Sequence, residues 1–185
     1  MSGNGGEQHL ASELLEQLAP RFPGIDVRVA HSDRWNRPCA TFCWDGFAGL
    51  LPEERFQRLA TVLPEDFRAS RMHGVVWMEL APGESVEAFL KLPRSEDLGD
   101  REEEIYRRLS KGGFFDLLAK RLGTAPKRSC GGDFRETASA IKRGKSIDVS
   151  LIDAKLVFIR RGVFCDCQVL QGAQPALAKR YAGAA

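Results

Sequence analysis

The sequence predicts an α+β protein of two parts, an αββαβα unit over residues 10–93 and a basic, mainly helical unit over residues 101–185. The first half switches between helical spacing and strict alternation of apolar residues, which is typical of mixed α/β structure. Net charge changes sign along the chain, from −5 over residues 1–98 to +7 over residues 99–185. Between the two halves, the polar and turn-prone residues 94–100 predict a linker.

Composition excludes several protein classes. With 43% hydrophobic and 28% charged residues, the chain of 185 residues is ordinary for a globular protein. Its apolar stretches are far shorter than the roughly 20 residues of a membrane helix, so no membrane partner is expected. Residues 1–9 are Gly-rich and polar, which predicts a flexible N-terminus without a signal peptide. Five cysteines, an odd number, with no export signal favour free thiols in the cytoplasm.

The elements of the first unit follow from spacing and from helix stops. Leu10, Leu14 and Leu18 lie at helical intervals, and Pro20 ends that helix. Pro52 is well placed as a first helical residue. The other predicted elements are a strand over residues 25–29, a strand over 40–44, a helix over 52–63, a strand over 73–80 and a short helix over 84–90.

Part of this unit resembles the BolA family, whose small α/β fold is KH-like. The resemblance covers roughly residues 10–92 and depends on residues 44–50, the run Glu54-Arg55-Phe56 and the run His73-Gly74-Val75-Val76. The Arg-His-Arg run of that family is absent, and residues 57–59 stand in its place.

The BolA resemblance implies a non-enzymatic partner of a glutaredoxin-like protein. In that arrangement His73 helps to bind a shared [2Fe–2S] cluster, and Cys39 assists. Imidazole replaces thiolate on one iron of Rieske centres, so this ligand type is chemically reasonable. The alternative is that His73 is simply a polar residue at the start of a strand and is not a ligand.

The second unit contains helices with recognisable ends. Ser150 and Asp153 form a capping pair at the start of one helix, and Gly112-Gly113 interrupts another. The predicted elements are a broken helix over residues 102–122, a loop over 125–133, a short helix over 134–144 and a helix over 150–161.

A Cys-Asp-Cys motif follows the last predicted helix. Residues 128–171 resemble a family of small uncharacterised bacterial proteins whose C-terminal signature is Gly-aromatic-Cys-Asp-Cys-Glu-Val-Leu; here Gln168 replaces the Glu. That family also has a Cys-Asp-His-Thr segment some 35 residues upstream; here Cys130 holds the Cys position, and Gly131-Gly132 replaces Asp-His. The resemblance implies no activity.

The cysteines of the second unit are candidate ligands for a soft metal. If Cys165 and Cys167 are extended, they point to the same side, about 6.6 Å apart. Together with Cys130 they offer three thiolates, which suit zinc or an iron–sulfur cluster. A closed structural zinc site needs a fourth ligand, and the sequence does not provide one. Buried or incidental cysteines are the alternative interpretation.

Clustered basic residues provide a second candidate site. Residues 118–161 hold 11 Lys and Arg against four acidic residues, a pattern that binds phosphate backbones or simply forms a solvated surface. The candidate nucleic-acid-binding residues are Lys127, Arg128, Lys142, Arg143, Lys145, Arg160 and Arg161.

Catalytic motifs are absent from the sequence. There is no Walker loop, no nucleophile elbow and no His-Glu-x-x-His. The sequence therefore favours a non-catalytic cytoplasmic adaptor or accessory protein with a protein partner, linked to zinc or [2Fe–2S] through His and Cys residues. The alternatives are a nucleic-acid-binding accessory protein that uses the basic half and, third, a thiol-dependent enzyme.

Overall fold

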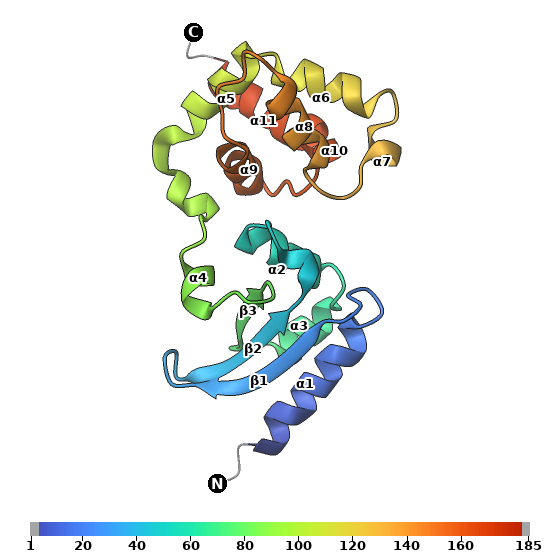
Figure 1. Cartoon of the computed structure of the whole chain (residues 1–185), viewed down its shortest axis with the longest axis vertical. Helices are drawn as coiled ribbons and strands as arrows, with labels where there is room; N and C mark the ends of the chain where they lie inside the picture. Colours follow the sequence, from blue (N-terminus) through green and yellow to red (C-terminus); the bar gives the residue numbers. More distant parts are fainter. Residues whose placement is uncertain (1–3, 183–185) are drawn as a thin grey trace. The chain divides into compact units, whose positions relative to one another are not determined.

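The computed structural model describes residues 4–182, except for the side chains of Asn4, Arg128 and Ser129. The fold is α+β, as the sequence predicts, and it divides into two compact units, Met1–Leu92 and Pro93–Ala185. Figure 1 shows the three strands in the first unit and helices throughout the described part of the second. Within residues 4–182, no helix combines the length and the apolar character needed to cross a membrane.

A three-stranded sheet organises the first unit. Its strands are β1 (Asp26–Ser32), β2 (Arg37–Cys43) and β3 (Val76–Leu80), in the order β1-β2-β3. The β1–β2 pair is antiparallel and the β2–β3 pair is parallel. Because a parallel pair needs a long crossover, the chain between β2 and β3 carries helices.

The helices of the first unit cover the sheet and complete its core. They are α1 (Asn4–Leu18), the 3-10 turn η1 (Asp45–Phe47), α2 (Pro52–Ala60), α3 (Glu65–Arg71) and α4 (Val86–Leu90). Ala40 and Phe42 are fully buried in one cluster with Leu14 and Leu18, so this face of β2 lies in the core. Pro52 is the first residue of α2, as expected.

Two features of the first unit differ from the sequence prediction. Residues 4–9 belong to α1, so the prediction of a flexible N-terminus over residues 1–9 is wrong for those residues; residues 1–3 lie outside the described part. Gly5 and Gly6 weaken a helix by about 1 kcal/mol each, but the helix continues through them. The second difference is α3, which adds a helix to the predicted order. None of its residues is buried, so its pattern of apolar residues carries little signal.

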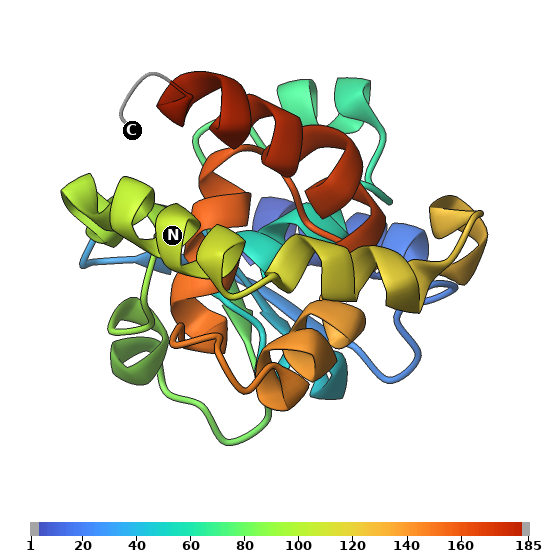
Figure 2. The ribbon, with the colours of Figure 1, turned by 90° about the horizontal axis from the view of Figure 1, so that it is seen from above.

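The second unit is built around one buried helix. That helix, α9 (Leu151–Arg160), buries most of its length, including Val157 and Phe158, and even the side chain of Lys155. Figure 2 shows α5 (yellow-green) followed by α6 (yellow) across the unit. The other elements of the unit are η2 (Ser95–Arg101), α5 (Glu102–Lys111), α6 (Phe114–Leu122), α7 (Pro126–Ser129), α8 (Arg135–Arg143), α10 (Asp166–Gln168), the π-helical turn η3 (Val169–Ala173) and α11 (Gln174–Tyr181).

Two predicted helix boundaries of this unit, the start of α9 and the break between α5 and α6, are confirmed, and neighbouring residues determine both. The Ser150 hydroxyl accepts a hydrogen bond from the Asp153 backbone N–H and caps α9. Gly113 adopts a left-handed conformation with φ of 69°, which separates α5 from α6.

The predicted linker over residues 94–100 is instead part of the second unit. Residues 95–101 form the helical segment η2, and Leu98 is only 1% exposed. The Arg160 guanidinium donates to the Gly99 carbonyl at 2.7 Å and to the Ser95 carbonyl at 3.1 Å. Burial of one leucine and the hydrogen bonds from α9 therefore order a polar segment.

Candidate metal centre

Three cysteines from distant parts of the second unit meet at one place. Cys130 follows α7, Cys165 precedes α10, and Cys167 lies within α10. Their sulfur atoms all lie within 4.8 Å of one another. We refer to Cys130, Cys165 and Cys167 as the cysteine cluster. All three residues are free cysteines and partly exposed.

Hydrogen bonds join the members of the cluster. The Sγ atoms of Cys165 and Cys167 are 3.5 Å apart. The backbone N–H of Cys167 donates to Cys130 Sγ at 3.5 Å. The motif is not extended throughout, because Cys165 has β geometry while Asp166 begins a helical turn. This bend brings the two neighbouring sulfurs together on one side.

Asp166 anchors the motif to the start of α8. Asp166 is 1% exposed, and its carboxylate accepts hydrogen bonds from the backbone N–H of Glu136 and of Thr137, both at 2.8 Å. Its own N–H donates to the Asp133 carbonyl at 2.9 Å. These bonds satisfy N–H groups that a helix leaves open at its first turn. Asp166 therefore fixes the position of the two flanking cysteines relative to α8, a role that the sequence pattern does not signal.

The three thiols differ in acidity. Burial acts to raise the pKa of Cys130, but hydrogen bonds to its sulfur outweigh burial, and the pKa of Cys130 is lowered. The donors are the backbone N–H groups of Cys167 and Gly132 and the thiols of Cys165 and Cys167. Burial raises the pKa of Cys165 to about 12 and also raises the pKa of Cys167.

The spacing of the cluster matches the coordination sphere of a single ion. Zinc binds thiolate sulfur at about 2.3 Å, so two sulfurs of a tetrahedral site lie about 3.8 Å apart. The separations here, 3.5 Å for one pair and within 4.8 Å for all, require only small side-chain movements. Among the described residues no fourth His, Cys, Asp or Glu joins the group. The cluster therefore offers three sulfur ligands and leaves the fourth position of a tetrahedral site open.

The other predicted ligands, His73 and Cys39, belong to the first unit. His73 is exposed in the turn before β3, and Cys39 lies on β2, partly buried beside the Met78 cluster. Burial raises the pKa of Cys39. Within the described residues neither side chain belongs to a group of three or more metal-binding side chains.

The predicted basic residues have different environments. Lys127, Lys142, Arg143 and Lys145 are exposed, whereas the side chain of Arg128 lies outside the described residues. Arg160 and Arg161 form ion pairs with the buried carboxylate of Glu102. These two arginines therefore hold α9 against the start of α5.

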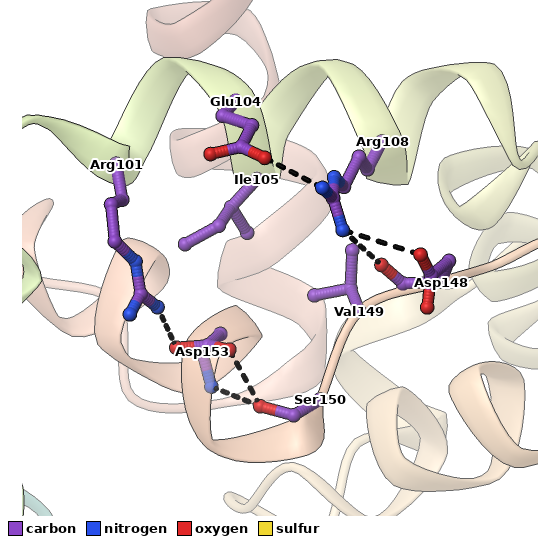
Figure 3. Close-up of a pocket in the computed structure, with 8 residues that line it drawn as sticks. All are labelled: Arg101, Glu104, Ile105, Arg108, Asp148, Val149, Ser150 and Asp153. Carbon is purple, nitrogen blue, oxygen red and sulfur yellow. Dashed lines mark hydrogen bonds and ion pairs between the residues drawn. The ribbon is translucent and has the colours of Figure 1, made fainter.

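A polar pocket of about 310 Å³ lies elsewhere in the second unit, between α5 and the start of α9. Figure 3 shows that its charged side chains bind one another: Arg101 pairs with Asp153, and Arg108 pairs with Glu104 and Asp148. Since Asp153 and Ser150 also form the cap of α9, the pocket wall serves the structure of the unit.

Comparisons with family models, with curated proteins and with solved structures found no match for this chain. The geometry of the site therefore carries the functional argument.

Proposed function

We propose that this chain is a non-catalytic accessory protein that binds one zinc ion through Cys130, Cys165 and Cys167. The observation that carries the proposal is the convergence of three sulfurs, from two segments 35 residues apart, within 4.8 Å of one another. Free cysteines are commonly buried singly as small apolar side chains. Here they are instead grouped, partly exposed and hydrogen-bonded to one another.

Zinc fits this donor set better than a [2Fe–2S] cluster does. A [2Fe–2S] cluster takes two protein ligands on each of its two irons, so its ligands fall into two separate pairs. Three sulfurs that are all mutual neighbours suit one ion, and soft thiolates select zinc among the common divalent metals. The glutaredoxin-linked cluster that the BolA resemblance implies would use His73 and Cys39 and would be a separate site.

The adaptor role follows from the open coordination position. A zinc ion with three protein ligands keeps a fourth position for water or for a side chain of another protein. A partner that supplies a thiolate or an imidazole would close the site. Five free thiols also fit a reducing compartment such as the cytoplasm.

The test is metal analysis of the full chain purified under nitrogen and without chelator. We expect one zinc per chain, lost in Cys165→Ser and retained in Cys43→Ser, whose cysteine is also partly exposed but lies on β2. Failure of the metal-free chain to take up added zinc would refute the proposal. Iron with acid-labile sulfide, lost in Cys165→Ser, would also refute it and assign an iron–sulfur cluster.

A further inference from the structure

The two sulfur atoms of the Cys-Asp-Cys motif lie close enough for a disulfide bond to form between Cys165 and Cys167. Cys165 Sγ and Cys167 Sγ are 3.5 Å apart, and a disulfide bond is about 2.05 Å long, so side-chain rotation has only about 1.5 Å to close. Helical backbone at the intervening residue places the Cα atoms of its two neighbours about 5.4 Å apart. This value lies inside the range of about 4.4 to 6.8 Å that disulfides require.

The first unit offers an internal contrast. Cys39 and Cys43 both lie on β2, four positions apart, which places their Cα atoms about 13 Å from each other. This pair cannot be bridged within the strand, although both cysteines are also free and partly exposed. Accessibility alone therefore does not distinguish the two pairs, whereas sulfur separation does.

We infer that the cysteine cluster is a reversible oxidation site, at which a hydroperoxide joins Cys165 to Cys167. One thiol of the pair attacks the peroxide; the O–O bond breaks, a sulfenic acid forms and water leaves when hydrogen peroxide is the oxidant. The second thiol then attacks that sulfur. The S–O bond breaks, the S–S bond forms and a second water leaves. The two sulfurs lose two electrons in total, and the peroxide accepts them.

Oxidation has a consequence for the metal, and this part rests on the proposed zinc site. A thiolate is the ligand, so a disulfide between Cys165 and Cys167 removes two of the three donors. Cys130 alone cannot hold the ion. One zinc is therefore released for each disulfide formed, and a dithiol reductant restores the site.

Peptide mapping tests the bond directly in the full chain, both metal-free and zinc-loaded. Cleavage after Lys and Arg leaves Cys165 and Cys167 together in the peptide of residues 162–179, while Cys130 lies in the peptide of residues 129–135. After hydrogen peroxide treatment and alkylation of the remaining thiols, we expect peptide 162–179 to have lost two hydrogens and to carry no alkyl group. Dithiothreitol should reverse the change. Cys130→Ser should keep the bridge, and Cys167→Ser should lose it.

Two results would overturn the inference: peptides 162–179 and 129–135 joined to each other, or sulfinic and sulfonic acids without a bridge. Zinc release is followed in parallel with a chromogenic chelator. A metal-free chain that forms the bridge but never binds zinc refutes the proposed function and leaves the oxidation site standing. A chain that binds zinc but forms no bridge in its metal-free form refutes the oxidation site alone.

Discussion

Replacing Asp166 by Asn tests whether this carboxylate holds the second unit together. The carboxylate oxygens accept from two backbone N–H groups at the start of α8, both at 2.8 Å. Asparagine keeps one acceptor, so one charge-assisted hydrogen bond worth about 1.5–3 kcal/mol is lost. The remaining bond becomes neutral, which costs about 1 kcal/mol more. Removal of a buried charge returns part of its desolvation cost, consistent with the pKa of Asp166, which burial raises. We expect a net loss of about 2–3 kcal/mol in the free energy of unfolding.

Urea denaturation of the metal-free full chain measures this loss. Far-UV circular dichroism follows the helices, while tryptophan fluorescence follows the first unit, because Trp35, Trp44 and Trp77 all lie there. The transition seen by circular dichroism should shift, and the fluorescence transition should not. Ser150→Ala removes the local cap of α9 and serves as a matched control, with an expected cost of about 1 kcal/mol.

A loss below about 0.5 kcal/mol for Asp166→Asn would refute the anchoring role, since surface substitutions commonly fall in that range. Residues that orient metal ligands commonly contribute about 10- to 100-fold to metal affinity. We therefore also expect the variant to bind zinc about 10- to 100-fold more weakly, as measured by competition with a chelating dye. Unchanged zinc affinity would show that Asp166 does not position Cys165 and Cys167.

Other measurements test the core, the first unit and the thiols. Phe158→Ala removes a fully buried ring stacked 5.8 Å from Phe114, so urea denaturation followed by circular dichroism should show a loss of about 3–5 kcal/mol; a loss under about 1 kcal/mol would contradict the central place of α9. Burial works to raise the pKa of Glu84, but hydrogen bonds from Arg55 and the Ala81 N–H prevail and lower it. The stability that Glu84 provides is thus present above its ordinary pKa of 4.5 and is lost as pH falls through its lowered value; an acid titration followed by tryptophan fluorescence should show this loss, and Glu84→Gln should lack it. Zinc uptake should release protons into a weakly buffered solution and weaken as the pH falls, because the raised pKa of Cys165 keeps that thiol protonated until the metal displaces the proton; pH-independent uptake would exclude thiolate ligands.

The sequence predicts those elements whose signals are local. The alternation around Val27 and Phe42 predicts two strands, and Ser150 marks a helix start, because neighbouring residues determine each feature. Helix α3 escapes such analysis, since it buries no residue and leaves no periodic apolar face. The segment η2 also escapes, because it is ordered by Leu98 and by Arg160, a residue about 60 positions away.

The sequence likewise predicts only part of the candidate site. Residue type and spacing identify Cys130, Cys165 and Cys167 as possible ligands, but an extended Cys-Asp-Cys segment would have turned Asp166 away from both cysteines. The helical turn at Asp166 depends on its bonds to α8, about 30 residues earlier in the chain. Such hydrogen bonds depend on tertiary structure, so no periodic pattern in the sequence predicts them.

The capping of α8 by Asp166 also constrains the order in which this unit can fold. Helical proteins usually fold fast because their contacts are local. Here the first turn of α8 is capped by a residue about 30 positions later in the chain. The loop that contains the whole of α9 must therefore close before this cap can form. During synthesis, the start of α8 and the cysteine cluster remain incomplete until residue 167 has emerged. We expect Asp166→Asn in the full chain to increase amide hydrogen exchange at the first turn of α8; full protection of that turn would show that the helix does not need this late cap.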